Sequence, residues 1–218
     1  MWVAVGRLDE MPSAGAFLSP TVGGDSLIVV RGSDDSTVRA FHNVCRHRGT
    51  QICDTTTGAF PGAIQCPYHA WTYDYDGRLI GAPHMDGSRA FDRESFPLFP
   101  VRCSVWDGTV FVSVAERGPS LQDQLADLPA RFAPWRMQRL AIGHRVTYDV
   151  AANWKLIVQN YNECLHCPTV HPVLNRLSHY LSGENTPLQP TYMGGRMDLN
   201  EGVATLSMDG SRRRAPLP

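Results

Sequence analysis

The stretch Cys45–Trp71, CRHRGTQICDTTTGAFPGAIQCPYHAW, places two short cysteine–histidine pairs on either side of an 18-residue spacer. The first pair is Cys45 and His47, with one residue between them, and the second is Cys66 and His69, with two. Thiolate sulfur and neutral imidazole are good ligands for borderline and soft metals. The stretch therefore predicts a metal centre held by two loops.

Two kinds of metal centre fit these four ligands. A single zinc ion takes all four at one point, whereas a [2Fe–2S] cluster with mixed ligands has two cysteines on one iron and two histidines on the other. Zinc loops usually keep like ligands together, as in Cys-x-x-Cys. The mixed pairs favour the two-iron cluster, and a zinc-stabilised binding module is the alternative.

The sequence around these loops, residues 1–115, consists of short apolar or alternating runs separated by turn residues, which is typical of β structure. Asp107-Gly108 lies between two such runs and favours a two-residue hairpin, because both turn positions need a positive φ. A small antiparallel sandwich or barrel is the natural architecture. The predicted strands are 2–5, 26–30, 37–41, 63–66, 72–75, 101–106 and 109–114.

The pattern changes near Gly118-Pro119, and the sequence predicts a domain boundary there. We expect an α+β protein with an all-β domain over 1–116 and an incomplete α+β domain over 117–218. Residues 120–132 predict a helix, since Leu121, Leu125 and Leu128 share one face and Ser120 can cap it. Residues 145–151 predict a strand. Residues 196–208 predict a hairpin that turns at 200–202.

Residues 153–167, NWKLIVQNYNECLHC, predict an amphipathic helix with Asn153 as its N-cap. Its apolar stripe is Trp154, Ile157, Val158, Tyr161 and Leu165, and its opposite side carries Asn160, Glu163 and His166.

The polar side of this segment contains a candidate metal site. Glu163 and His166 are three residues apart and therefore neighbours on a helix surface. His171 follows Pro168, where the helix should end, and a bend there would bring its imidazole back towards His166. Two histidines and one carboxylate on an iron leave open positions for O₂ and substrate. The alternative is that both histidines are surface or capping residues.

Both metal-site segments have counterparts in one protein family. CRHRG (45–49) and CPYHAW (66–71) resemble the two cluster-binding loops of Rieske proteins. NWK, followed by NY-x-E-x-x-H-x4-H-P, resembles the catalytic α subunit of Rieske non-heme iron oxygenases. The resemblance covers essentially the whole chain. It implies a Rieske [2Fe–2S] module followed by the first part of a helix-grip (START-like) catalytic domain.

The resemblance also implies roles for particular residues. Cys45, His47, Cys66 and His69 would hold the [2Fe–2S] cluster, and His166 and His171 a mononuclear non-heme Fe(II). Glu163 falls where the family has a carboxylate that links the cluster of one subunit to the iron of its neighbour, and Asn160 lies beside that iron. The family's third iron ligand, an Asp, comes far downstream of the second histidine. We therefore expect a truncated chain that is inactive alone.

The family resemblance implies an activity and partners. Electrons from NAD(P)H would reach the cluster through a reductase or ferredoxin, and O₂ activated at the iron would hydroxylate or demethylate a small organic substrate. Glu163 within NYNECLHC resembles the branch that acts on quaternary ammonium compounds such as glycine betaine, carnitine or stachydrine, and an aromatic ring is the alternative. The full-length protein would be a homotrimer. A Rieske ferredoxin-type electron carrier is the rival reading, and it leaves residues 119–218 unexplained.

The composition sets limits on other functions. A net charge of −1 and a pI near 6.7 give no electrostatic reason to expect nucleic acid. No apolar run reaches the ~18 residues that a membrane span needs, and no signal peptide is visible, so we expect a cytoplasmic protein. Six cysteines do not suggest a disulfide framework, and Cys53 and Cys103 read as small buried hydrophobes. Cys164-x-x-Cys167 suggests a redox dithiol, although no thioredoxin-like βαβ pattern surrounds it.

Overall fold

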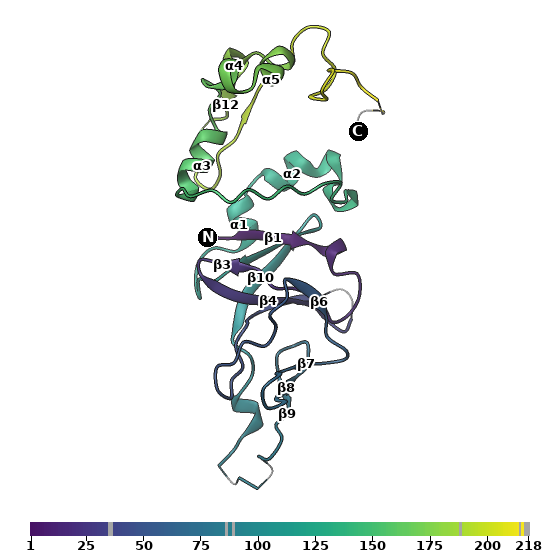
Figure 1. Ribbon diagram of the computed structural model, residues 1–218, viewed down its shortest axis with the longest axis vertical. Helices are drawn as coiled ribbons and strands as arrows, with labels where there is room; N and C mark the ends of the chain where they lie inside the picture. Colours follow the sequence, from purple (N-terminus) through teal and green to yellow (C-terminus); the bar gives the residue numbers. More distant parts are fainter. Residues whose placement is uncertain (35–36, 86, 89, 188, 214, 216–218) are drawn as a thin grey trace. The chain divides into compact units, whose positions relative to one another are not determined.

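The computed structural model describes residues 1–34, 37–85, 87–88, 90–187, 189–213 and 215, and its chain divides into two compact units (Figure 1). Unit 1 comprises Met1–Asp123 and Arg136–Ala141, and unit 2 comprises Gln124–Trp135 and Ile142–Pro218. Unit 1 is built of strands and unit 2 mainly of short helices, so the chain is α+β as predicted. The boundary between residues 116 and 117 stays a prediction.

Unit 1 contains an eight-stranded antiparallel sheet with the order β1-β11-β10-β5-β4-β2-β6, in which β3 pairs with β4. A three-stranded antiparallel sheet has the order β7-β8-β9. The strands are β1 (Val3–Arg7), β2 (Ala16–Leu18), β3 (Thr21–Val22), β4 (Asp25–Arg31), β5 (Val38–His42), β6 (Thr57–Ala59), β7 (Ile64–Gln65), β8 (Thr72–Tyr73), β9 (Leu79–Gly81), β10 (Pro100–Trp106) and β11 (Thr109–Ser113). The 3-10 helices of this unit are η1 (Leu8–Glu10), η2 (Arg93–Ser95) and η4 (Met137–Arg139).

The β10–β11 hairpin has the predicted turn. Asp107 and Gly108 join the two strands with φ of 49° and 83°, and the flanking pair Trp106 and Thr109 closes the ladder. Positive φ at both positions matches the right-handed twist of the strands. The dipeptide therefore fixes the register of this hairpin.

Strand β4 is buried on both faces, which explains its unbroken apolar sequence. Leu27 and Val29 pack into one hydrophobic core, and Ile28 and Val30 pack into a second. A strand between two cores loses the alternating pattern of a half-exposed strand. We call the second core the loop-side core, and its buried members are Phe17, Ile28, Val30, Phe41, Cys45, Ile52, Cys53, Ile64, Cys66, Trp71, Tyr73, Tyr75, Leu79, Ala82 and Leu98.

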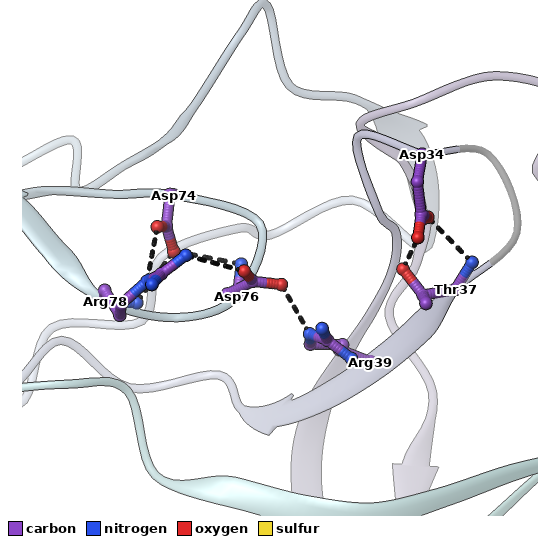
Figure 2. Close-up of polar contacts among 6 residues, drawn as sticks. All are labelled: Asp34, Thr37, Arg39, Asp74, Asp76 and Arg78. Atoms are coloured by element: carbon purple, nitrogen blue, oxygen red, sulfur yellow. Dashed lines mark hydrogen bonds and ion pairs between the residues drawn. The ribbon is translucent and has the colours of Figure 1, made fainter.

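A network of exposed ion pairs connects the β8–β9 turn to β5. Figure 2 shows Asp76 between two guanidinium groups, accepting from Arg39 Nε at 2.6 Å and from Arg78 at 2.8 Å. Arg78 Nε also donates to Asp74 at 2.9 Å. Exposed pairs of this kind contribute little each, about 0–1 kcal/mol. Their position matters more, because β5 and β8 both adjoin the cysteine–histidine loops.

Unit 2 differs from the sequence prediction in several elements. The predicted helix over 120–132 is interrupted at Ala126, where φ is 50°, although Ser120 Oγ accepts from Asp123 N–H as a cap. The predicted strand over 145–151 does not form. A turn is present at 200–202, but β13 pairs with β12 and no hairpin follows the turn. The elements are α1 (Leu121–Leu125, assigned mostly to unit 1), α2 (Leu128–Phe132), η3 (Ala133–Trp135), α3 (Trp154–Tyr161), α4 (Cys167–Val170), α5 (Pro172–Leu177), η5 (Tyr180–Ser182), β12 (Glu184–Asn185) and β13 (Gly195–Arg196).

Helix α3 begins as predicted, because Asn153 Oδ1 accepts from Lys155 N–H at 3.0 Å. It ends at Tyr161, four residues before the predicted stripe ends at Leu165. No helix in the described part of the chain is long and apolar enough to cross a bilayer.

Candidate functional site

The two cysteine–histidine loops have the same backbone hydrogen bonds. Cys45 N–H donates to Thr50 C=O, and Cys66 N–H donates to Trp71 C=O, each five residues later and each at 2.8 Å. The carbonyl of each cysteine accepts from the residue four positions on, Gly49 or Ala70, at 3.0 and 3.1 Å. The two loops are therefore two copies of one turn, which the unequal Cys–His spacings conceal.

The equivalent positions Gly49 and Ala70 both have left-handed backbone, with φ of 74° and 56°. Glycine adopts this conformation without strain, whereas a side chain makes it unfavourable. Ala70 therefore carries a strain that Gly49 does not, and the hydrogen bonds of the turn hold it in place.

The first loop is fastened by the buried side chain of Asn43. Asn43 Oδ1 accepts from the N–H groups of Ile52 and Cys53, both at 3.0 Å. Its Nδ2 donates to Cys53 C=O at 2.7 Å and to Ser26 Oγ at 3.1 Å. The buried Asn43 amide thus joins the start of the first loop to Ile52 and Cys53 at its end. The bond to Ser26 also ties the loop to β4.

Cys45 and Cys66 belong to the loop-side core, and their side chains interact. Burial raises the pKa of the Cys66 thiol, and the neighbouring Cys45 raises it further, while the N–H groups of Tyr68 and His69 act in the opposite direction. Both cysteines are free thiols. Two buried, neighbouring thiols that form no disulfide suit a bound metal, because a metal ion deprotonates a thiol that coordinates it.

Tyr73 provides a hydrogen bond at the first of these sulfurs. Its hydroxyl lies 3.4 Å from Cys45 Sγ and accepts from Arg46 N–H at 3.1 Å. Burial, more than the hydrogen bond with Cys45, raises the pKa of Tyr73 far above its ordinary value. The hydroxyl stays protonated, so it is the donor whenever the sulfur is a thiolate.

The two histidines lie together at the outer side of the loops. The ring centroids of His47 and His69 are 4.8 Å apart, with His47 exposed and His69 half-buried. Local desolvation lowers the pKa of His47, and the charges of His69 and Arg48 lower it further. A neutral imidazole is the form that binds metal.

Aromatic rings fix the orientation of both imidazoles. The buried indole of Trp71 stacks on His47 with 4.8 Å between ring centroids and 9° between planes. The exposed ring of Tyr68 lies 3.8 Å from that of His69. Arg46 packs against Phe99 at 4.1 Å and donates to Pro97 C=O at 2.6 Å, so the first loop is also anchored to the segment before β10.

The four residues fit a two-iron cluster better than one zinc ion. A zinc site needs four ligands at one point, whereas each iron of a mixed-ligand cluster needs two protein ligands. Here the cysteines pair inside the core, and the histidines pair at its edge.

The second candidate site is a turn rather than a helix surface. Because α3 ends at Tyr161, Glu163 and His166 meet across the turn that follows it, and Glu163 Oε1 lies 2.6 Å from His166 Nδ1. Pro168 lies in the first turn of α4 instead of ending a helix. The ring of His171 lies 5.2 Å from that of His166, so the two imidazoles are brought together as predicted.

The electrostatics of this turn favour an ionised carboxylate. The hydrogen bond with His166, followed by the one from Leu165 N–H at 2.7 Å, lowers the pKa of Glu163. With Nδ1 occupied by Glu163, His166 has Nε2 left for a metal, the usual arrangement of a carboxylate behind a ligand histidine. Asn160 is exposed on α3, and the described contacts include no hydrogen bond from it to either histidine.

Cys164 and Cys167 are joined by a disulfide, which the cysteine count did not predict. Of the other two unassigned cysteines, Cys53 is buried as predicted, whereas Cys103 is only partly buried. Burial raises the pKa of the Cys103 thiol to about 12.

Sequence reasoning missed the residues that support the first site. In TYDY (72–75), alternation places Tyr73 and Tyr75 on one face, which signals burial but not a contact with Cys45. Nothing in the sequence distinguishes Asn43 from a surface residue at a strand end.

Two family models match the chain. Residues 1–99 match the Rieske [2Fe-2S] domain, and residues 137–218 match the ring hydroxylating alpha subunit (catalytic domain). The chain is 40% identical over 192 residues to the glycine betaine monooxygenase oxygenase subunit of Chromohalobacter salexigens, covering 88% of this chain and 42% of that protein. It is 38% identical over 173 residues to the carnitine monooxygenase oxygenase subunit of Escherichia coli K12, covering 78% and 46%. It thus spans less than half the length of these relatives.

Solved structures give the same result. A quaternary ammonium Rieske monooxygenase, crystallised with an inhibitor, superposes with a TM-score of 0.83 at 31% identity, covering 93% of this chain and 56% of that one. Naphthalene 1,2-dioxygenase from Rhodococcus sp. superposes with a TM-score of 0.79 at 26% identity, covering 93% and 49%. With an all-β Rieske domain followed by part of a ring-hydroxylating catalytic domain, this chain belongs to the Rieske non-heme iron oxygenase α subunits.

Proposed function

We propose that the chain is part of the oxygenase component of a multicomponent Rieske system that hydroxylates or demethylates a small quaternary ammonium compound. The observation that carries this proposal is the presence in one chain of two matched Cys/His loops and of a second histidine pair backed by a carboxylate. The glycine betaine and carnitine monooxygenase subunits among its relatives support the substrate class.

In this proposal the first site stores and passes one electron at a time. Cys45 and Cys66 would hold one iron of the [2Fe–2S] cluster from inside the loop-side core, and His47 and His69 would hold the other at its edge. The cluster, when bound, supplies one-electron redox chemistry. His47 and His69 lie at the outer side of the loops, where an electron would leave a bound cluster. Tyr73 and Trp71 hold Cys45 and His47 in position.

The second site would hold mononuclear non-heme Fe(II) through His166 and His171, with Asn160 beside it. This iron, when bound, supplies O₂ activation. Glu163 fixes the Nδ1 side of His166, and we propose that it links this histidine to the Rieske site of a neighbouring subunit. As in the family that the sequence resembles, we propose that the third iron ligand is a carboxylate that does not belong to this chain.

The proposed partners follow from the assignment of electron transfer to the first site and of O₂ activation to the second. A reductase or ferredoxin would deliver electrons from NAD(P)H, and the second site would receive O₂ and the substrate. We propose a homotrimer for the full-length protein, since the link through Glu163 needs a neighbouring subunit. A cytoplasmic location agrees with the use of NAD(P)H.

The test is metal content and turnover of the full-length protein. Two irons per chain would indicate a Rieske ferredoxin-type carrier, and a third iron would indicate an oxygenase. With reductase and NADH, we expect O₂-dependent conversion of glycine betaine or carnitine, with formaldehyde released wherever an N-methyl group is hydroxylated, and no conversion of an aromatic acid. A colourless protein containing zinc would refute the cluster, and ring hydroxylation without formaldehyde would refute the substrate class.

Glu163 provides a sharper test of the link between the sites. Glu163→Gln and Glu163→Ala should retain both metals yet lose about 10–100-fold in coupled turnover, the usual effect of removing a carboxylate behind a ligand histidine. Glu184→Gln, which removes an exposed carboxylate paired with Arg196, is the matched control and should be unchanged. Normal turnover of both Glu163 variants would refute the linking role.

The lowered pKa of Glu163 predicts how the coupled turnover rate depends on pH. The pKa of Glu163 is lowered in the folded chain, so its contribution is complete above the ordinary carboxyl pKa of about 4.3 and is lost only as pH falls through the lowered value. We therefore expect the acid limb of the coupled rate to contain no Glu163 titration above that range. An additional inflection above about pH 5 that disappears in Glu163→Gln would contradict this expectation.

A further inference from the structure

Cys164 and Cys167 form a disulfide within a four-residue turn, with their Cα atoms 5.0 Å apart. Inside the turn, Cys167 N–H donates to Cys164 C=O at 3.0 Å. The other four cysteines, Cys45, Cys53, Cys66 and Cys103, are free. Cys164 and Cys167 therefore form a disulfide that is separate from the free thiols assigned to the cluster.

The disulfide spans the turn on which Glu163 and His166 meet. Glu163 immediately precedes Cys164, and His166 immediately precedes Cys167, so the closed ring fixes the separation of the backbone positions that carry them. Beyond the ring, His171 N–H donates to Cys167 C=O at 2.9 Å. The ring thus holds the start of the short helix that ends at the second histidine.

We propose that Cys164 and Cys167 are a reversible dithiol–disulfide site, and that the oxidised form holds the turn that joins Glu163 to His166. The proposal goes beyond the oxygenase function, because it needs neither the cluster nor O₂ activation. It depends only on the placement of the two sulfurs around the polar pair.

The two sulfurs differ in access, which sets the order of the chemistry. Cys167 is 2% exposed, whereas Cys164 is half-buried. In oxidation, the Cys164 thiolate attacks hydrogen peroxide, the O–O bond breaks, and a sulfenic acid and one water form after protonation. The Cys167 thiol then displaces the hydroxyl as a second water and forms the S–S bond.

Reduction begins at the same, more accessible sulfur of Cys164. A small dithiol attacks Cys164 Sγ, which releases the Cys167 thiolate and gives a mixed disulfide. The second thiol of the reductant then frees Cys164 and leaves as a cyclic disulfide. Two electrons and two protons pass from the reductant to the two cysteines.

One tryptic peptide contains both cysteines, because trypsin cleaves after Lys155 and Arg176 and nowhere between them. The mass of this peptide therefore shows whether the two cysteines are oxidised or reduced. The folded 218-residue chain is treated with peroxide or dithiothreitol, quenched in acid and alkylated under denaturing conditions. We expect peptide 156–176 to be unalkylated and lighter by two hydrogens after peroxide, doubly alkylated after dithiothreitol, and unalkylated again on reoxidation. Two alkylatable thiols after peroxide, or a disulfide that dithiothreitol leaves intact, would overturn the proposal.

Variants test the predicted order. Cys167→Ser should leave an accessible Cys164 that forms a mixed disulfide with oxidised glutathione, and Cys164→Ser should leave a buried Cys167 that reacts at least about tenfold more slowly. Cys103→Ser is the control and should keep the full response of peptide 156–176. Equal rates for the two single variants would refute the assignment of Cys164 as the attacked sulfur.

Hydrogen exchange of the unsubstituted chain tests the holding role without any risk of misfolding. Opening a ring of this size releases chain entropy worth on the order of a tenfold change in equilibrium. The amides of Cys167 and His171 should therefore exchange about tenfold faster in the reduced chain. The Cys45 amide, in the other unit, is the internal reference and should not change. Identical exchange in both states would show that the disulfide holds nothing.

Discussion

The two candidate sites of this chain are supported in different ways. The first region comprises the loops Cys45–Thr50 and Cys66–Trp71, and the second region is the segment 153–171. Cys45 and Cys66 are each 3% exposed, and their loops are tied to strands by backbone bonds, Asn43 and Arg46. In the second region every residue of α3 is exposed, including Trp154 at 57% and Leu156 at 59%. The first site therefore has a packed core beneath it, whereas the second is held by a turn and a disulfide.

The comparison shows what an apolar pattern does and does not establish. The apolar run of β4 is buried, because both faces of the strand meet a core within the described chain. The apolar stripe of α3 and the alternating residues Val146, Tyr148 and Val150 also predict burial but stay exposed. A strand needs a partner strand and an amphipathic helix needs a covering surface, so pattern alone does not form either.

The largest expected effect is the loss of the cluster from a single core substitution. Cys66→Ala should lower iron and sulfide in the reconstituted chain from two of each to nearly none, with loss of visible absorption, because one iron loses half of its protein ligands. Cys53→Ala, at another buried free cysteine, should keep the cluster. Cys167→Ala, a buried position of the second region, should keep it as well.

These variants test whether the two regions are independent and whether the ligand assignment is correct. If Cys167→Ala removed the visible absorption, the two regions would not be independent. If Cys66→Ala retained it, the ligand assignment in the first region would be wrong.

The next effect compares the same substitution in both regions. Asn43→Ala leaves the buried N–H groups of Ile52 and Cys53 without acceptors, and at about 1–3 kcal/mol each it should destabilise unit 1 by roughly 3 kcal/mol. Asn153→Ala removes only an exposed helix cap and should cost α3 about 1 kcal/mol.

Native-state hydrogen exchange suits this pair, because it measures opening in each unit separately. Equal losses at Asn43 and Asn153 would mean that the first loop is not fastened more strongly than the exposed helix. A loss at Asn43 that spread to α3 would mean that the two units unfold together.

The sequence predicted the first region well because its determinants are local. Two Cys/His pairs, the turn residues Asp107-Gly108 and the apolar run of β4 each specify structure within a few positions. The interruption of the helix at Ala126 and the end of α3 at Tyr161 were missed, since both depend on which surfaces lie against the helix. The residues behind the ligands were also missed, because Tyr73 and Cys45 are brought together only by the packed sheets.

A smaller effect tests whether that packing tunes the first site. Tyr73→Phe removes the hydroxyl 3.4 Å from Cys45 Sγ, and hydrogen bonds to cluster sulfurs raise the reduction potential. A tenfold weaker one-electron equilibrium corresponds to a fall of about 59 mV. Tyr75→Phe is the matched control, since its hydroxyl donates to Phe60 C=O and accepts from Gly62 N–H. A redox titration in which both variants shift alike would show that the potential responds to packing and not to the sulfur bond.

The smallest expected effect concerns the two matched turns. Ala70 has φ of 56°, and a left-handed side chain costs roughly 1–2 kcal/mol, partly offset by the 0.5–1 kcal/mol that glycine loses in backbone entropy. Ala70→Gly should therefore stabilise unit 1 by up to about 1 kcal/mol. Gly49→Ala should destabilise it by a similar amount, because no atom lies within 4 Å of an added Cβ and only the backbone strain remains. If hydrogen exchange shows that Ala70→Gly stabilises unit 1 and Gly49→Ala destabilises it, the two loops are two copies of one turn. If both variants change the stability in the same direction, the two turns are stabilised by different contacts despite their matching hydrogen bonds.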